Sequence, residues 1–238
     1  MKTNQENRTA TYPIFTVYLS CMNENPDLMN KLNVLLAEDE TLVREGMRAL
    51  LEKEPFIRNI YEASTGQEAI DLMGSYKIDL VLLDIRMPGL GGAEVVQQLR
   101  QRNESLKIII VTGLDGIELI INLLRMGVNG IVYKLHGFGE ILKAILSVIE
   151  RGSYFPEQVL QTIRQNAERW ENVPPVSLSE KDRLLLGAIV ESLTTKQMAT
   201  KLHMSERTAE TYRQRLIKKV GMQNTAGLIA YAFRKGII

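Results

Sequence analysis

Short apolar runs in this chain end in side chains that could do chemistry. Leu80-Val-Leu-Leu83 stops at Asp84, and the Met87-Pro-Gly89 turn after it prevents the strand from continuing. The run is typical of a buried parallel strand, so Asp84 stands at its carboxyl end, where open α/β sheets place ligands. Asp84 is therefore either a helix cap or a working carboxylate.

Three other apolar runs end in the same way, in the acids Glu38 and Asp39, the hydroxyl of Thr112 and the amine of Lys134. The carboxyl ends of parallel strands meet at one edge of a sheet. Carboxylates so close repel one another unless a cation lies among them, and a hard ion such as Mg²⁺ suits their oxygens. A phosphoryl group on Asp84 would then have the metal, the Lys134 ammonium and the Thr112 hydroxyl as partners.

The positioning elements follow an alternating pattern between residues 31 and 151. Strands are expected near 33–37, 57–61, 79–83, 107–111 and 129–133, and helices near 40–53, 66–75, 93–102, 115–126 and 138–151. Five such units predict an α/β domain with a doubly wound parallel five-stranded sheet, covered by helices on both faces.

Residues 177–238 are predicted to form a small all-α domain. Ser179 and Asp182 make a weak capping-box pattern before the first helix, and later helices are expected near 194–203, 205–220 and 224–235. The second and third helices are joined by a short turn, and the third is basic. This is the helix-turn-helix arrangement, in which the second helix of the pair enters the major groove.

Charge differs between the two modules. Residues 177–238 contain eleven Lys and Arg against five Asp and Glu, whereas residues 31–150 contain thirteen against seventeen. A basic module attached to an acidic one favours nucleic-acid contact by the basic part, and an ordinary solvated surface is the alternative.

Composition indicates a cytoplasmic protein with no membrane contact. Apolar residues make up 45% of the 238 residues, there is one cysteine, and no apolar run approaches the ~20 residues needed to cross a bilayer. Residues 1–30 are interpreted as a disordered tail, or as residues upstream of a start at Met29. The segment 152–176 is interpreted as a linker, because Gly and Pro residues flank a helix expected over 157–170.

On these motifs, nearly everything after Lys31 resembles a two-component response regulator, whose receiver domain has a flavodoxin-like fold. The resemblance implies that a sensor histidine kinase phosphorylates Asp84. It also implies that Glu38 and Asp39 are the acidic Mg²⁺ pair and that the backbone carbonyl of Arg86 completes the metal site. Thr112 would be the switch hydroxyl, and Lys134 would bind the phosphate.

One position departs from the receiver pattern. Three residues before the lysine, where the family has an aromatic switch residue, this chain has Ile131. Tyr133 lies two residues further on and shares the face of Ile131. Either Tyr133 supplies the aromatic group, or the usual coupling to the hydroxyl is absent.

The last domain resembles the LuxR-type DNA-binding domain of the NarL/FixJ family. The matching segments are Leu178-Ser-Glu180, Thr194-Thr-Lys-Gln-Met-Ala199 and Leu202-His-Met-Ser-Glu-Arg-Thr208. Where the family has a lysine that faces DNA, this chain has Glu210. A glutamate there either reads a base, by accepting a hydrogen bond from a cytosine amino group, or weakens DNA affinity.

Candidate DNA contacts follow from this alignment. Glu210 and Gln214 lie four apart on one helical face and are candidate base readers, and Thr211 is adjacent to them. Arg207, Arg215 and Lys219 are candidate phosphate contacts, and Lys218 is a further candidate DNA contact. Tyr212 is expected to be half-buried, with its hydroxyl bonded to the backbone.

The sequence therefore predicts a transcription regulator and not an enzyme. Phosphorylation of Asp84 would favour a homodimer, or release an inhibitory contact with the output domain, and the basic domains would bind paired half-sites in double-stranded DNA. The resemblance implies that the last helix supplies the dimer contact on DNA. Two alternatives remain open: a phosphorylation-gated module whose degenerate output domain binds a protein, and a DNA-binding regulator that is independent of phosphorylation.

Overall fold

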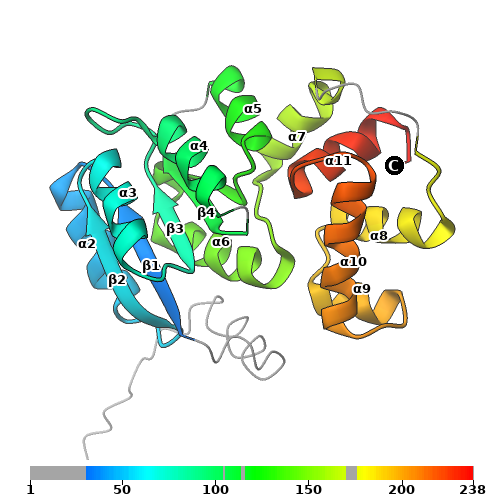
Figure 1. Ribbon diagram of the computed structural model, residues 1–238, viewed down its shortest axis with the longest axis horizontal. Coiled ribbons are helices and arrows are strands. Elements are labelled where there is room, and N and C mark those ends of the chain that lie inside the picture. The colour runs from blue at the N-terminus through cyan, green and yellow to red at the C-terminus, as the bar shows by residue number, and fades with distance from the viewer. Residues whose placement is uncertain (1–30, 104, 114–115, 170–175, 238) are drawn as a thin grey trace, which may run out of the picture.

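The computed structural model describes residues 31–103, 105–113, 116–169 and 176–237, so the expectations for residues 1–30 and for the end of the linker helix lie outside these residues. An α/β domain and an all-helical domain follow one another along the chain, with helix α7 (Glu157–Gln165) between them (Figure 1). None of the described helices combines the length and apolar composition needed to cross a membrane.

The first domain is built on a parallel sheet of five strands in the order β2-β1-β3-β4-β5. The strands are β1 (Leu32–Ala37), β2 (Ile57–Ala63), β3 (Leu80–Leu83), β4 (Lys107–Thr112) and β5 (Gly130–Tyr133). The order reverses between β1 and β3, the point at which doubly wound sheets bind ligands. The predicted flavodoxin-like fold is confirmed.

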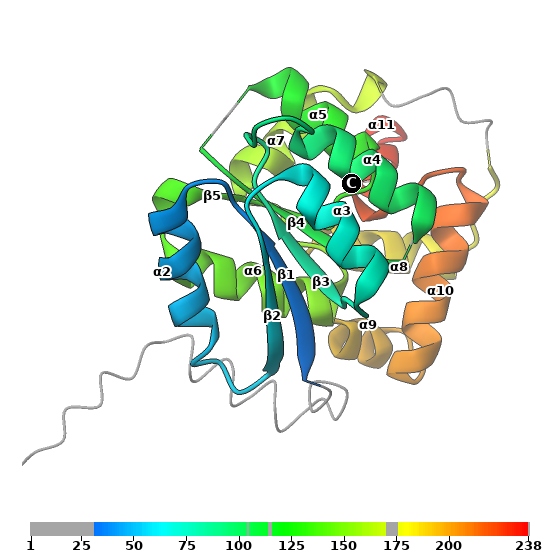
Figure 2. The same cartoon turned by 60° about the vertical axis from the view of Figure 1, so that its left-hand side comes forward.

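Helices cover both faces of the sheet because its strand residues alternate between two cores. Val34 and Leu36 point into one core, and Leu35 and Ala37 point into the other. Figure 2 shows the first face covered by two helices, α2 (Thr41–Leu51) and α6 (Phe138–Arg151). The second face is covered by α3 (Gly66–Ser75), α4 (Gly92–Arg102) and α5 (Ile117–Arg125). A short 3-10 turn, η2 (Lys134–His136), follows β5.

The second domain contains four helices with side-chain caps. They are α8 (Glu180–Val190), α9 (Thr195–Lys201), α10 (Glu206–Lys219) and α11 (Thr225–Arg234). Each helix starts after a residue whose side chain accepts a hydrogen bond from an N–H three residues further on, namely Ser179, Thr194, Ser205 and Asn224. The Ser179 capping box is complete, because Asp182 also accepts a hydrogen bond from the Ser179 N–H at 2.8 Å.

The two domains share one apolar core. Residues of β3, β4 and α5 join through Val159 and Ile163 of α7 to the buried residues of α8 to α11. Helix α11 packs against α5, α7, α8 and the 3-10 turn η3 (Ala167–Arg169). The segment between the domains is thus folded over much of its length, and the helical domain is docked on the α/β domain.

Candidate functional site

Four strand ends place polar side chains at one edge of the sheet, as expected. Glu38, Asp84 and Thr112 are buried, with exposed fractions of 1%, 4% and 2%. The Lys134 ammonium lies 2.7 Å from Asp84 Oδ2 and 2.8 Å from Glu38 Oε1. One cation therefore bridges two carboxylates that come from strands more than forty residues apart in the sequence.

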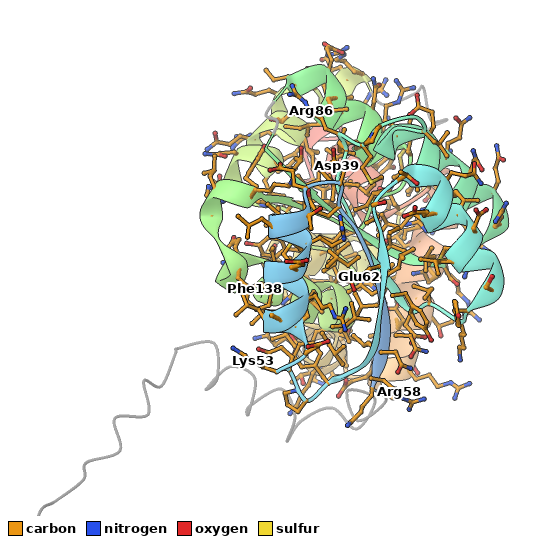
Figure 3. All side chains as sticks on the ribbon, turned by 90° about the vertical axis from the view of Figure 1, so that its left-hand side faces the viewer. Asp39, Lys53, Arg58, Glu62, Arg86 and Phe138 are labelled. Atoms are coloured by element: carbon orange, nitrogen blue, oxygen red, sulfur yellow. The ribbon has the colours of Figure 1, made fainter. Side chains whose placement is uncertain are left out.

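Glu38, Asp39 and Asp84 form a carboxylate cluster. Each offers an oxygen, and these oxygens all lie within 4.8 Å of one another. Among the described residues this is the one cluster of His, Cys, Asp and Glu with metal-ligand spacing. Figure 3 shows Asp39 and Arg86 at the same end of the domain, away from Arg58 and Lys53 at the other end. The oxygen donors match the preference of Mg²⁺.

Burial and the neighbouring charges of opposite sign shift the pKa values of Glu38 and Lys134 in opposite directions. Burial raises the pKa of Glu38, and the Asp84 charge adds to this, while the hydrogen bond from Lys134 opposes it. For Lys134, burial lowers the pKa, but the hydrogen bonds to Asp84 and Glu38 outweigh burial and raise it. Lys134 is therefore a cation, fixed against both acids.

Asp84 is not the cap of the next helix. Its Oδ1 accepts hydrogen bonds from the N–H groups of Ile85 at 2.6 Å and Arg86 at 3.3 Å. Helix α4 starts later, with Gly91 as its N-cap residue. Gly92 packs so tightly on the backbone of Asp84 and Ile85 that a Cβ would not fit. Of the two readings left open by the sequence, the structure excludes the helix cap.

The Thr112 side of the pocket has an inward-facing tyrosine and open space. Thr112 lies opposite Tyr133 in the register of β4 and β5, and an added Cβ at Gly113 would meet no described atom within 4 Å. Ile131 and Tyr133 are both buried in the same core, so the prediction that they share a face is confirmed. The Tyr133 ring contacts His136 edge-on, with centroids 5.6 Å apart.

Most candidate DNA contacts lie on the accessible part of α10. Exposed side chains are those of Arg207, Thr211, Gln214, Arg215 and Lys218. Lys219 is also exposed, but its ammonium lies 2.6 Å from Asp182 Oδ2. In this conformation Lys219 therefore joins α10 to the cap of α8.

The expectation for Tyr212 is wrong in one respect. The residue is half-buried, but its hydroxyl donates to the Asp182 carboxylate at 2.8 Å rather than bonding to the backbone. Burial alone would raise the pKa of Asp182, but bonds from Lys219, the Ser179 N–H and Tyr212 outweigh it and lower the pKa to about 2. The sequence showed the cap, but not the two additional partners.

Arg213 is buried against the α/β domain, and Glu210 beside it is partly exposed. Arg213 is 4% exposed and donates a hydrogen bond to the backbone carbonyl of Arg151, at the end of α6. The Glu210 carboxylate pairs with Arg213 and accepts a hydrogen bond from Gln214 at 3.1 Å. Burial raises the pKa of Glu210, but the Arg213 charge outweighs burial and lowers it.

Two further side chains of the DNA-binding domain bond to ends of receiver helices. The Thr195 hydroxyl donates to the carbonyl of Glu150, and Asn224 Nδ2 donates to the carbonyl of Leu124 at 2.7 Å. Both carbonyls belong to the last turn of a helix, where acceptors lack intrahelical partners. The Leu124 carbonyl also accepts a hydrogen bond from the Gly127 N–H, so Asn224 is its second donor. Together with Arg213, Thr195 and Asn224 form what we call the docking triad. Sequence reasoning missed it, because each of the three has an ordinary local role.

Comparisons with known proteins agree with this architecture. The model of the response regulator receiver domain matches residues 34–146, and that of bacterial regulatory proteins of the luxR family matches residues 176–232. The chain is 32% identical over 217 residues to the transcriptional regulatory protein MctR of Rhizobium johnstonii, with 91% of this chain and 98% of that protein covered.

Other relatives point the same way. The response regulator UvrY of Escherichia coli is 30% identical over 209 residues, with 87% of this chain and 95% of that protein covered. The solved complex of the two-component response regulator RcsB with DNA has a TM-score of 0.53 at 25% identity, with 85% and 98% covered. With a receiver domain followed by a LuxR-type helix-turn-helix domain, this protein belongs to the two-component response regulators of the NarL/FixJ family.

Proposed function

We propose that Asp84 is the phosphoryl acceptor of this response regulator. An oxygen of its carboxylate attacks the phosphorus of a phosphohistidine on the sensor kinase, and the bond from that phosphorus to the histidine nitrogen breaks. The observation that carries the proposal is the Lys134 ammonium, 2.7 Å from Asp84 and 2.8 Å from Glu38. Its charge stands where the phosphoryl oxygens would come to lie, which favours transfer.

The acidic cluster supports Mg²⁺ as the cofactor. Glu38, Asp39 and Asp84 would hold the ion through carboxylate oxygens, and the Arg86 carbonyl would complete the protein ligands. When bound, Mg²⁺ supplies positive charge to the phosphoryl oxygens. The Thr112 hydroxyl, buried beside open space at Gly113, would donate a hydrogen bond to the phosphorylated product.

Intact mass spectrometry tests this assignment. The full-length protein is incubated with acetyl phosphate and MgCl₂, and one phosphoryl group per chain is expected. Asp84→Asn should take up none, and replacement of MgCl₂ by EDTA should abolish uptake in the wild type. Asp71→Asn is the matched control, because Asp71 is an exposed acid of α3 outside the cluster. Label that persists in Asp84→Asn would overturn the assignment.

The output is sequence-specific binding of double-stranded DNA by the α9–α10 pair. Helix α10 enters the major groove, where Thr211 and Gln214 are the accessible base readers. Arg207, Arg215 and Lys218 contact phosphates, and Lys219 would do so after leaving Asp182. A solved structure of the relative RcsB contains two dimers bound to two parallel DNAs, which supports a homodimer as the DNA-binding form.

The docked arrangement supports a mechanism in which phosphorylation separates the DNA-binding domain from the receiver. In the docked arrangement, Arg213 is buried against the end of α6 and Glu210 is held in an ion pair with Arg213, so the base-reading surface of α10 is incomplete. Helix α11, expected to supply the dimer contact, is covered by α5 and α7. Phosphorylation of Asp84 would favour the separated domains, and with them DNA binding and transcriptional control in the cytoplasm.

The domain boundaries in this proposal are residues 31–151 for the receiver, 152–176 for the linker and 177–238 for the DNA-binding domain.

One observation favours a rival function for the output domain. The pairing of Glu210 with Arg213 lowers the positive charge offered to DNA, which suits an output domain that binds a protein. The salt dependence of binding to selected genomic fragments separates the two, since phosphate contacts weaken steeply as salt rises.

A further inference from the structure

A cavity of about 250 Å³ lies where the receiver, the segment after α6 and the DNA-binding domain meet. Arg151 ends α6, Ser153 and Phe155 belong to the following segment, and Met198 and Ile229 come from the DNA-binding domain; all five line the cavity. Because both domains contribute to its wall, the complete cavity exists only while they are docked.

One residue that lines this cavity, Arg151, has a side chain without a partner among the described residues. Within the described part of the chain, the Arg151 side chain donates no hydrogen bond and forms no ion pair, and its Nε atom is buried without a partner. The other charged residues that line the cavity are Lys143 and Glu157. Lys143 lies 3.7 Å from Glu140 and over the Tyr154 ring, and Glu157 is exposed at the start of α7.

An unpaired guanidinium lining a cavity is suited to one kind of ligand. The planar fork of an arginine matches a carboxylate with two parallel hydrogen bonds. A single free charge favours a monoanion over a dianion, since a second negative charge would find its neighbouring cation already engaged with Glu140.

Apolar side chains of the DNA-binding domain also line the cavity. Met198 is 1% exposed, Ile229 is 3% exposed and Ile189 is 6% exposed, and all three line the cavity. An apolar cavity of roughly 150 Å³ is enough to bind benzene. A volume of about 250 Å³ therefore has room for a hydrocarbon body of phenylalkyl size together with its carboxylate.

We infer that this cavity binds a small amphipathic monocarboxylate, with its carboxylate on Arg151 and its hydrocarbon body against Met198, Ile189 and Ile229. Such a ligand binds the docked arrangement and not the separated domains. By mass action it opposes release, so it lowers DNA binding by the factor one plus the ratio of ligand concentration to its Kd. This second step rests on the function proposed above; the binding step does not.

Calorimetry on the full-length protein tests the binding step with 3-phenylpropionate as the probe. Saturable binding is expected, with affinity lower by about tenfold or more for 3-phenylpropanol, which has the same body without the charge. Arg151→Gln should lower the affinity for 3-phenylpropionate to the same extent. Arg58→Gln is the control, because Arg58 belongs to β2, at the opposite edge of the sheet from β5, beside which the cavity lies. This variant should bind the probe as the wild type does.

A second pair of variants keeps the test decisive if Arg151→Gln disturbs folding. Ser153→Asp places a carboxylate at the cavity wall beside Arg151 and should abolish binding, whereas Ser153→Asn has nearly the same shape and should retain it. No saturable binding at about 10 mM probe overturns the inference, as does binding that neither Arg151→Gln nor Ser153→Asp weakens.

Fluorescence anisotropy with a selected DNA fragment tests the regulatory step. The probe should lower the DNA affinity of the unphosphorylated wild type, and should leave that of Ser153→Asp unchanged. Calorimetric binding without any effect on DNA would overturn regulation by the ligand while leaving the cavity assigned. The two failures are therefore distinguishable, and both are separate from a failure of Asp84 phosphorylation.

Discussion

The guanidinium of Arg213, on the helix that faces DNA in this family, donates a hydrogen bond to the backbone carbonyl of Arg151 at the end of the receiver domain. Gly152, at φ +75°, allows this approach, because a Cβ there would collide with the guanidinium. The Arg213 side chain therefore joins helix α10 to the receiver domain. It cannot occupy the DNA groove and the end of α6 at the same time.

Asn224 allows docking to be weakened without loss of a helix cap. Its Oδ1 accepts a hydrogen bond from the Gly227 N–H at 2.9 Å, and its Nδ2 donates to the Leu124 carbonyl at 2.7 Å. Asn224→Asp keeps the acceptor and turns the donor into an oxygen that repels that carbonyl. The unphosphorylated variant should bind DNA about five- to tenfold more tightly, measured by fluorescence anisotropy.

Asn224→Ala is the comparison for that experiment. It loses the cap as well, so its free energy of unfolding in urea should fall by about 1 kcal/mol, whereas Asn224→Asp should be much closer to the wild type. Unchanged DNA affinity in Asn224→Asp, together with unchanged hydrogen exchange in α5 and α11, would show that this bond does not restrain the domains.

Thr112 should separate phosphorylation from its readout. Thr112→Val keeps the buried shape but removes the hydroxyl, so acetyl phosphate should still label Asp84. The gain in DNA affinity on phosphorylation should fall by about tenfold, because a hydrogen bond to a charged group is lost. Thr112→Ser, which keeps the hydroxyl, should retain most of the gain. A full gain in Thr112→Val would mean that the switch runs without this residue.

Glu210 should oppose DNA binding through its own charge and through Arg213. Glu210→Gln removes a negative charge near the phosphates and frees Arg213 from its ion pair. DNA affinity at low salt should rise several-fold, and the slope of log affinity against log salt should steepen by about one phosphate contact. A loss of affinity confined to fragments with one particular cytosine would instead identify Glu210 as a base reader.

Asp182 gives the helical domain an acid-dependent stability. Its pKa is about 2 in the folded protein, below its ordinary value of 3.8, so the folded state favours the charged form. This contribution is fully present above about pH 4 and is lost as pH falls toward 2; it amounts to about 2 kcal/mol. In urea unfolding at pH 5, the free energy of unfolding of Asp182→Asn should be lower than that of the wild type by this amount. Near pH 2 the difference between the two proteins should shrink, because the wild-type carboxylate becomes protonated.

Glu180→Gln is the matched control for the pH experiment, because Glu180 is an exposed acid in the first turn of the same helix. It should unfold within a few tenths of a kcal/mol of the wild type at either pH. A difference between Asp182→Asn and the wild type that stays constant from pH 5 to 2 would contradict the lowered pKa.

The strand ends of the receiver were predictable because each is specified locally. An apolar run before Asp84, Glu38 or Lys134 fixes both the strand and the place where it stops, and parallel strands bring their carboxyl ends to one edge. The helix starts at Ser179 and Ser205 were predictable for a similar reason, since a cap is made within four residues.

The expectations that failed, or were never formed, depend on residues distant in sequence. The Tyr212 hydroxyl bonds to Asp182, thirty positions away, and Lys219 reaches the same carboxylate from the end of α10. Neither pairing leaves a periodic pattern, because each depends on the angle at which α8 and α10 cross.

The sequence by itself determined the family, the carboxylate pocket around Asp84 and the helix-turn-helix, because these consist of local elements with fixed polarity and capping. Only the tertiary structure decided how the domains meet. Docking sets Arg213, Thr195 and Asn224 against carbonyls of the receiver, and leaves Arg151 unpaired at a cavity. Those contacts come from packing two separately folded surfaces, whose relative position no local pattern of residues encodes.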